Sequence, residues 1–134
     1  MRVLSDIEAS YIAGLMDGEG WITISKTLPA FYTIDCGIAM TSKDTIEFAG
    51  PAIGIGVKEY QYSDSKTLYR IGAYGRRAQE FIRQLLPYLI NKKRHAELAL
   101  AFPIGGSRSD DKKIMQRVIF EEIRKLNSKG RDLE

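Results

Sequence analysis

The sequence predicts an α+β fold in the order αββαββα, with an antiparallel four-stranded sheet and helices on one face. Two pairs of runs alternate between apolar and polar residues with the period of strands, and a short turn joins each pair. Helix-period segments, two of them with capping signals, lie before, between and after these pairs. Helices and hairpins in this order pack as one sheet covered by helices.

The first half of the chain contains a helix, a hairpin and a second helix. A capping box at Ser5–Glu8 begins the first helix, which we predict over 6–17, before Gly18-Glu19-Gly20. Strands are predicted over 21–27 and 31–41, with a turn at 28–30. A second capping box at Thr41–Asp44 begins a short helix, which Gly50-Pro51 is expected to stop.

The second half contains another hairpin and the remaining helices. We predict strands over 55–62 and 67–74, then a helix through 78–89 whose last turn Pro87 distorts. Helices over 92–102 and 110–127 follow, and the apolar side of the last one is Met115, Val118, Ile119, Ile123 and Leu126. We expect residues 1–127 to form a single domain and residues 128–134 to be a frayed tail.

Charge is unevenly distributed along this chain of 134 residues, although its net charge is only +3. Residues 5–19 contain four acids and no base, whereas residues 76–94 contain six bases and one acid. This arrangement suits an enzyme that acts on a polyanion, because bases bind phosphates while acids bind metal. The alternative is an ordinary solvated helix face.

The single cysteine, Cys36, excludes an intramolecular disulfide and a cysteine-based zinc site. Its place in an alternating apolar run predicts a buried, inert thiol. The N-terminus lacks a signal-peptide pattern, and no apolar run approaches the length of a membrane span. We therefore expect a soluble intracellular protein.

The stretch Tyr11–Trp21 combines small helix residues with two carboxylates between glycines. Ala13 and Gly14 allow close packing of the helix against another backbone. Asp17 and Glu19 place an acidic tip where the helix stops. The tip is either a site for a metal or a cationic partner, or only a turn.

With this helix end, the order of elements resembles the LAGLIDADG homing endonucleases over residues 5–125. The motif, Ile12-Ala-Gly-Leu-Met-Asp-Gly-Glu-Gly20, keeps the Ala-Gly pair, both acidic positions and the closing glycine of that family. The segment Leu85–Leu98 is also similar. One copy of the motif occurs, and the resemblance therefore implies a homodimer whose motif helices pack about a two-fold axis. The interface residues that it implies are Tyr11, Ala13, Gly14 and Asp17.

The resemblance also implies the catalytic groups. Glu19 matches the acidic position that binds Mg²⁺, with Mn²⁺ as an alternative, and the carbonyl of Gly18 is the expected second ligand. Asp17 matches the structural acidic position. The spacing permits either Lys92 or Arg94 to occupy the place of a catalytic lysine, beside Lys93. Ser42 lies near a position that holds a water-positioning glutamine in some members, and His95 is interpreted as a packed or solvent-exposed residue.

The polar face of the predicted sheet is the expected DNA-binding surface, because a twisted hairpin fits the major groove. Arg70 and Lys58 are the candidates for reading guanine, and Asp35 for cytosine. Two subunits would cover a pseudo-palindromic site of about twenty base pairs. The expected contacts are Trp21, Thr23, Ser25, Thr27, Thr33, Asp35, Lys58, Tyr60, Tyr62, Lys66 and Arg70.

Three functions are consistent with the sequence. The first is a DNA-associated homing endonuclease of the kind that acts in intron homing and makes metal-dependent double-strand breaks. The second is a non-cleaving nucleic-acid binder of the same fold, either an intron RNA maturase or a transcription factor. The third is a small α+β ligand-binding domain. The acidic Glu19 and the basic residues 92–94 favour the first.

Overall fold

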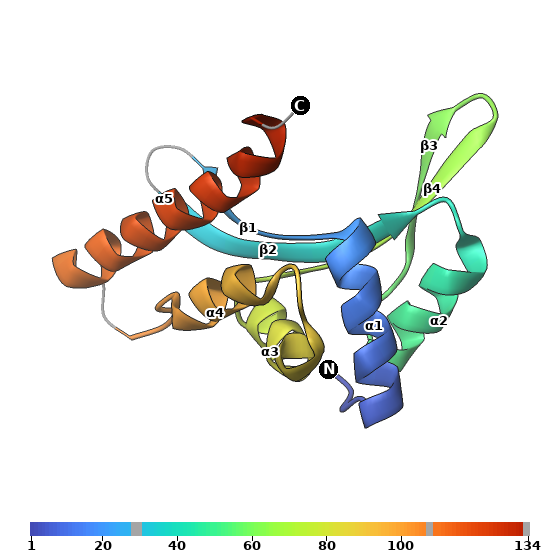
Figure 1. Cartoon of the computed structure of the whole chain (residues 1–134), viewed down its shortest axis with the longest axis horizontal. Coiled ribbons are helices and arrows are strands. Elements are labelled where there is room, and N and C mark those ends of the chain that lie inside the picture. The colour runs from blue at the N-terminus through green and yellow to red at the C-terminus, as the bar shows by residue number, and fades with distance from the viewer. Residues whose placement is uncertain (28–30, 107–108, 133–134) are drawn as a thin grey trace.

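The computed structural model describes residues 1–27, 31–106 and 109–132, excepting the side chains of Tyr62 and residues 129–132. Figure 1 shows the helices and strands along the chain. Their bounds are α1 Asp6–Glu19, β1 Gly20–Thr27, β2 Phe31–Met40, α2 Lys43–Ile53, β3 Lys58–Ser63, β4 Lys66–Tyr74, α3 Gly75–Leu85, the 3-10 turn η1 Leu86–Tyr88, α4 Lys93–Ala101 and α5 Asp110–Asp132.

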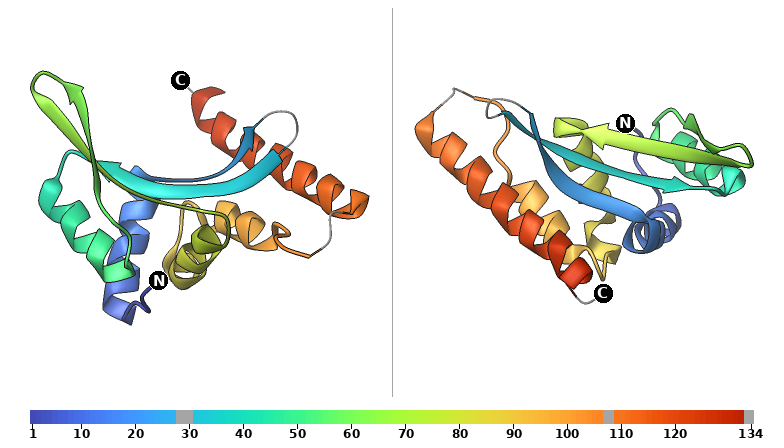
Figure 2. Two further views of the ribbon diagram at one scale, coloured as in Figure 1. Left: turned by 180° about the vertical axis from the view of Figure 1, so that it is seen from behind. Right: turned by 90° about the horizontal axis from the view of Figure 1, so that it is seen from above.

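The four strands form one antiparallel sheet in the order β1-β2-β4-β3. Helices α1 to α4 lie on one side of this sheet (Figure 1), and α5 runs alongside the outer strand β1 (Figure 2). The predicted fold class and element order are confirmed. The prediction of strands over 21–27 and 67–74 is correct to within one residue, whereas β3 begins three residues later than predicted.

The core lies between the sheet and the helices, and aliphatic side chains dominate it. Ile12 and Met16 of α1 and Phe81 of α3 are fully buried against the inner face of the sheet. Cys36 is buried and free in this core, and its burial raises the pKa of its thiol, as expected for an inert cysteine. The chain's first helix is therefore anchored to the sheet by one apolar side.

The capping box of α1 is confirmed. The Ser5 hydroxyl accepts a hydrogen bond from the Glu8 amide at 3.1 Å, and the Glu8 carboxylate accepts one from the Ser5 amide at 2.9 Å. The backbone hydrogen bond from Ser5 lowers the pKa of Glu8, and the one from its side chain acts in the same direction. These contacts fix the residue at which α1 begins.

Helix α2 differs from the prediction at both ends. Its N-cap is Ser42, whose side chain bonds the Thr45 hydroxyl at 2.7 Å instead of a backbone amide, so the predicted capping box is absent. Pro51 lies inside the helix and does not stop it. The helix ends at Gly54, which adopts φ +84° and donates its amide to the Gly50 carbonyl at 2.8 Å.

Two further differences concern the C-terminal half. Helix α3 ends at Leu85, before the predicted end at 89, and Pro87 lies in the 3-10 turn η1 that follows, because proline cannot continue the helix. Helix α5 continues to Asp132, beyond the predicted end near Asn127. Its buried positions are Ile119 and Ile123, whereas Met115 and Val118 are half exposed, so the predicted apolar side was too wide. No helix in the described ranges is long and apolar enough to cross a membrane.

Candidate active site and nucleic-acid interface

The C-terminal end of α1 is held to the segment between η1 and α4 by Asp17. One carboxylate oxygen of Asp17 accepts the Ile90 amide at 2.8 Å, and the other accepts the Lys92 amide at 2.9 Å. The Asn91 side chain also donates to the Asp17 carbonyl at 3.3 Å. The two hydrogen bonds to the carboxylate are charge-assisted, and such bonds are stronger than neutral ones. Asp17 therefore joins two segments that lie more than seventy residues apart in the chain.

This connection brings Lys92 to the tip of α1. The Lys92 ammonium donates to the Asp17 carbonyl at 3.0 Å, two residues before Glu19. Lys93 and Arg94 are exposed and make no comparable contact with the tip in the described part of the chain. Of the two residues that the spacing permits, Lys92 is therefore the one that lies beside the acidic tip.

Glu19 is exposed where α1 ends, and β1 begins at the next residue. The negative end of the helix dipole and the free carbonyls of a last helical turn favour a cation at this position. Within the described residues, no group of three or more His, Cys, Asp or Glu residues could hold a metal. One carboxylate with backbone oxygens suits Mg²⁺, which keeps several waters and binds substrate phosphates. Glu19 and the Gly18 carbonyl are therefore the groups of this helix end that fit such an ion.

Two other candidates have explained positions. Ser42 is the exposed N-cap residue of α2, and its hydroxyl bonds the Thr45 hydroxyl. The His95 Nε2 atom bonds the Asn127 side-chain oxygen at 3.0 Å, which joins α4 to α5, while its buried Nδ1 atom has no partner among the described residues. Burial of the imidazole lowers the pKa of His95, the bond with Asn127 opposes this, and the nearby charge of Lys92 lowers it further.

The strand register places the predicted DNA contacts on the sheet face that points away from the core helices. Trp21 pairs with Gly37, Thr23 with Asp35, Ser25 with Thr33 and Lys58 with Arg70. Tyr60 and Lys66 are exposed on the second hairpin, and Thr27 is exposed at the end of β1, where its hydroxyl donates to the Phe31 carbonyl at 3.5 Å. The side chain of Tyr62 lies outside the described residues.

Several of these side chains bind one another. The Trp21 indole donates to one Asp35 oxygen at 2.9 Å, and the Ser25 hydroxyl donates to the other at 3.3 Å. The Arg70 guanidinium lies 4.5 Å from the centre of the Trp21 ring and donates to the Tyr74 hydroxyl at 3.4 Å. Tyr74 is absent from the predicted contacts, although the alternation of β4 through Arg70 and Gly72 places it on the same face.

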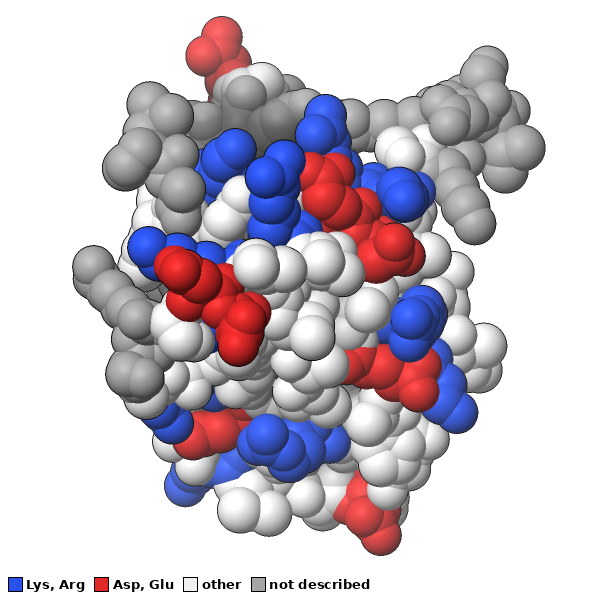
Figure 3. All heavy atoms as spheres, turned by 90° about the vertical axis from the view of Figure 1, so that its left-hand side faces the viewer, with Lys and Arg blue, Asp and Glu red and all other residues white. Residues whose placement is uncertain are grey.

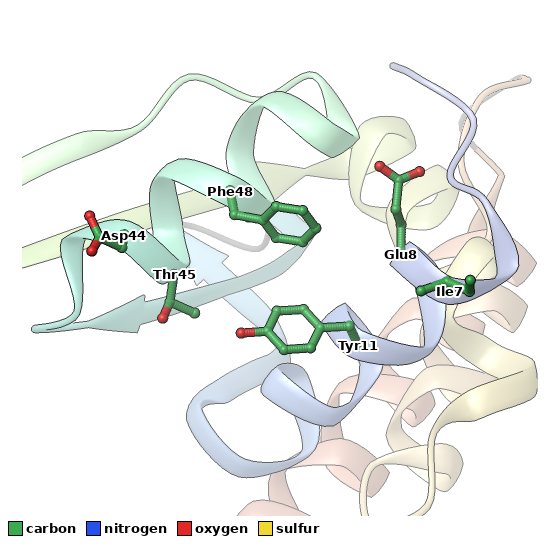
Figure 4. A pocket seen from close by; sticks show the side chains of 6 residues that line it. All are labelled: Ile7, Glu8, Tyr11, Asp44, Thr45 and Phe48. Atoms are coloured by element: carbon green, nitrogen blue, oxygen red, sulfur yellow. The ribbon is translucent and has the colours of Figure 1, made fainter.

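The side of α1 opposite the core is exposed, and its residues follow one another at intervals of one helical turn. Ile7 is 82% exposed, Tyr11 is 49% exposed, and a Cβ atom built at Gly14 or Gly18 meets nothing within 4 Å. Tyr11 meets Phe48 of α2 edge-on, with 5.5 Å between ring centres. Figure 4 shows these rings over an open groove of about 440 Å³, which is lined by Ile7, Glu8, Tyr11, Asp44, Thr45 and Phe48.

Two of the four predicted interface residues are placed differently. Ala13 is fully buried in the core of its own chain, because it shares a helix side with Ala9 and Met16. The Asp17 carboxylate is occupied by amides of its own chain. Within the single chain these two side chains are thus engaged by their own fold, whereas Tyr11 and Gly14 lie on the surface of α1. The four residues stay a prediction for the dimer interface.

The surface charge is mixed where the sequence suggested segregation. On the side of the molecule in Figure 3, Lys and Arg side chains alternate with Asp and Glu, and they form no continuous basic area in that view. The six bases of residues 76–94 are divided among α3, the segment before α4 and α4 itself.

The architecture and the acidic helix end define the class of fold, which is that of the LAGLIDADG homing endonucleases. The structure of the homing endonuclease I-CvuI with its target and Ca²⁺ matches at a TM-score of 0.68 and 15% identity, covering 90% of this chain and 82% of that one. The archaeal intron-encoded I-Vdi141I, complexed with DNA, matches at 0.54 and 17% identity, covering 89% and 98%. The LAGLIDADG meganuclease I-AabMI, bound to uncleaved DNA, matches at 0.54 and 22% identity, covering 69% and 35%. No family model and no curated protein matches the sequence.

Proposed function

We propose that this chain, as a single domain over residues 1–127, is a homing endonuclease that makes metal-dependent double-strand breaks in DNA. The observation that carries the proposal is the contact of Lys92 with the tip of α1. This contact holds a cation at the helix end that also carries the exposed Glu19, two residues after Asp17, and Lys92 and Glu19 come from segments far apart in the sequence. Solved structures of this fold were determined with target DNA and Ca²⁺, and with DNA and Mg²⁺.

In the proposed hydrolysis of the phosphodiester, each of these residues has a different role. When bound, Mg²⁺ supplies Lewis-acid polarisation of the phosphate and lowers the pKa of water. Glu19 and the Gly18 carbonyl hold it, while the Lys92 ammonium stabilises negative charge that develops at the phosphate in the transition state. Asp17 orients Lys92 through its backbone amide. Arg94 is left as a contact to the DNA backbone, for which its exposed position is suited.

We propose that the active form is a C2 homodimer. Tyr11 and Gly14 contact the same face of the second copy, and each copy contributes one Glu19 at the two-fold axis. An isologous contact of this kind implies a pseudo-palindromic DNA site. The absence of a complete ligand set within the described residues of one chain is consistent with this arrangement.

A cleavage assay tests the proposal. The protein is incubated with a DNA library in Mg²⁺, in Mn²⁺ and in EDTA, and the new ends are sequenced. We expect double-strand cuts at one long site with either metal and none in EDTA. Site-specific binding without cuts would instead establish a non-cleaving nucleic-acid binder.

The variant Glu19→Gln tests the role of the acidic tip. Removing the charged ligand is expected to lower the cleavage rate at least about a hundredfold while binding to the site persists, because the carboxylate acts on the metal and not on the bases. Glu19→Asp is the matched control, and it should retain activity because it keeps the charge. If Glu19→Gln cleaved as fast as the parent, Glu19 would not be a metal ligand.

A further inference from the structure

The outer face of the sheet contains a hollow beside the tip of α1. Gly37 of β2 is paired with Trp21 on one side and with Gly72 of β4 on the other. A Cβ atom at Gly37 would lie 2.5 Å from the indole ring, and one at Gly72 would lie 3.6 Å from the Arg70 Nε atom. The missing side chain at Gly37 therefore leaves the space that the indole occupies, whereas a Cβ atom at Gly72 would be in ordinary contact with the guanidinium.

The indole in this hollow is fixed by Asp35. Its N–H donates to the carboxylate at 2.9 Å, and Ser25 donates to the second oxygen at 3.3 Å. A carboxylate on a surface that binds a polyanion repels it, unless hydrogen-bond donors of the same chain stabilise the negative charge of the carboxylate. Here each oxygen already accepts one hydrogen bond from the chain itself, which favours a role for Asp35 in holding the indole over a contact with a cytosine amino group.

The guanidinium of Arg70 is positioned but not neutralised. It stacks 4.5 Å from the centre of the Trp21 ring. The ion pairs in the described part of the chain are Lys43–Glu47 and Lys125–Glu122, so no carboxylate there pairs with Arg70. A planar guanidinium held on a ring keeps donors in a fixed fork, which matches the O6 and N7 atoms of guanine.

The register also locates the base that Arg70 would reach. Arg70 pairs with Ala39, and the adjacent Ile38 pairs with Gly20, the residue after Glu19. Arg70 is therefore level with the tip of α1 along the strands. Two residues of strand rise about 7 Å and a base pair about 3.4 Å, so this offset along the strands corresponds to about two base pairs from the cleaved phosphate.

We infer that Arg70 sets a guanine preference next to the cleavage position, and that Trp21 and Asp35 position its guanidinium without reading a base themselves. This inference rests on the proposed function, because it requires site-specific DNA binding. It assigns Asp35 a role different from the cytosine contact expected from the sequence, and it favours Arg70 over Lys58, which is exposed on β3.

The test measures binding in EDTA to the selected site and to its single-base variants. Arg70→Ala should remove a guanine preference of about ten- to a hundredfold at one base pair in each half-site. Asp35→Leu should lower the same preference about fivefold, whereas Asp35→Asn, which keeps an acceptor for the indole, should retain most of it. Lys58→Ala is the control, and it should weaken binding to all sequences alike.

Fluorescence of the free protein provides a readout that does not depend on DNA. Trp21 is the only tryptophan in the chain, so its emission reports its own surroundings. Arg70→Ala should shift this emission while the unfolding temperature stays close to that of the parent. An unchanged emission would contradict the stacked arrangement.

Four results would overturn the inference. Arg70→Ala could instead weaken binding to all sequences equally and lower by about one the slope of the logarithm of the binding constant against the logarithm of the salt concentration. In that case Arg70 would contact a phosphate. If Asp35→Leu changed the preference at a different base pair, Asp35 would read a base. If the parent bound no DNA specifically, both the inference and the proposed function would fail. If the parent cut its site but Arg70→Ala kept the guanine preference, the inference alone would be refuted.

Discussion

The two acidic residues at the end of α1 have different surroundings, although only one residue separates them. Asp17 accepts two backbone amides from the segment before α4, whereas Glu19 is exposed beyond the last turn. The first carboxylate is thus a structural group and the second is a group that an external ligand can reach. Loss of each acid therefore has different consequences.

Asp17→Asn is expected to destabilise the fold and to lower the cleavage rate. An amide has one acceptor oxygen, so one of the two amide hydrogen bonds is lost or weakened, which costs about 2 kcal/mol. Thermal unfolding should show a decrease of roughly 5 to 10 °C for a chain of this size. Asp111→Asn, which neutralises an exposed acid in the first turn of α5, is the control and should change neither property.

His95 is expected to make stability depend on pH. Its pKa in the folded protein is lowered below the usual value of about 6.5, so the unfolded chain binds more protons between these two values. The free energy of unfolding should therefore fall as the pH decreases below about 6.5. Unfolding temperatures of the parent and His95→Gln between pH 5 and 7.5 test this, and equal slopes would contradict it.

At the scale of the elements, the residue at which α2 ends is determined by its C-cap glycine more than by the helix-breaking proline in its sequence. Pro51 remains within the helix, and the chain turns only at Gly54, whose left-handed conformation brings its amide onto the Gly50 carbonyl. The next residue, Ile55, donates its amide to the same carbonyl and is buried. The geometry of Gly54 therefore determines where the chain enters the second hairpin.

Gly54→Ala is expected to cost about 1 kcal/mol in the free energy of unfolding, because a side chain is strained at φ +84°. A Cβ atom there would also lie 3.3 Å from atoms of Arg2. Gly56→Ala is the matched control, since Gly56 has no positive φ and a Cβ atom there meets nothing within 4 Å. Chemical denaturation of both variants measures the difference, and equal losses would refute the role of Gly54.

At the scale of the whole molecule, one side of the sheet packs against the core and the other faces away from the core helices. Helices α1 to α4 cover the first side (Figure 1), and the second carries the connected side chains Trp21, Asp35 and Arg70. Helix α1 has two sides as well: its buried side packs on the sheet, while its other side is exposed. The proposed dimer places this exposed side at the two-fold axis.

Gly14→Arg is expected to convert the dimer to a monomer without unfolding it, because the position is open in the single chain and closed in the proposed interface. Analytical ultracentrifugation measures the change in mass, and circular dichroism checks the fold. Lys113→Glu on α5 is a control that should leave the dimer intact. A Gly14→Arg variant that remained dimeric would show that α1 is not the interface.

The sequence predicted the elements that local patterns determine. Alternation identified the strands and the outer face of the sheet, and the capping box located the start of α1. The contact of Asp17 with the Ile90–Lys92 segment has no local signal, because it joins residues about seventy-five positions apart. Burial of Ala13 was also missed, since a small residue fits both a close interface and a helix packed on its own sheet.

The strand order has a consequence for the behaviour of the protein at high concentration. β1 and β3 are the outer strands, and an open strand edge can pair with another molecule and begin aggregation. Helix α5 accompanies β1 (Figure 2), while β3 is short, carries Lys58 and Glu59, and shifts register near Gln61. Both edges are therefore poor templates for a fifth strand, and the sheet resists growth into fibres.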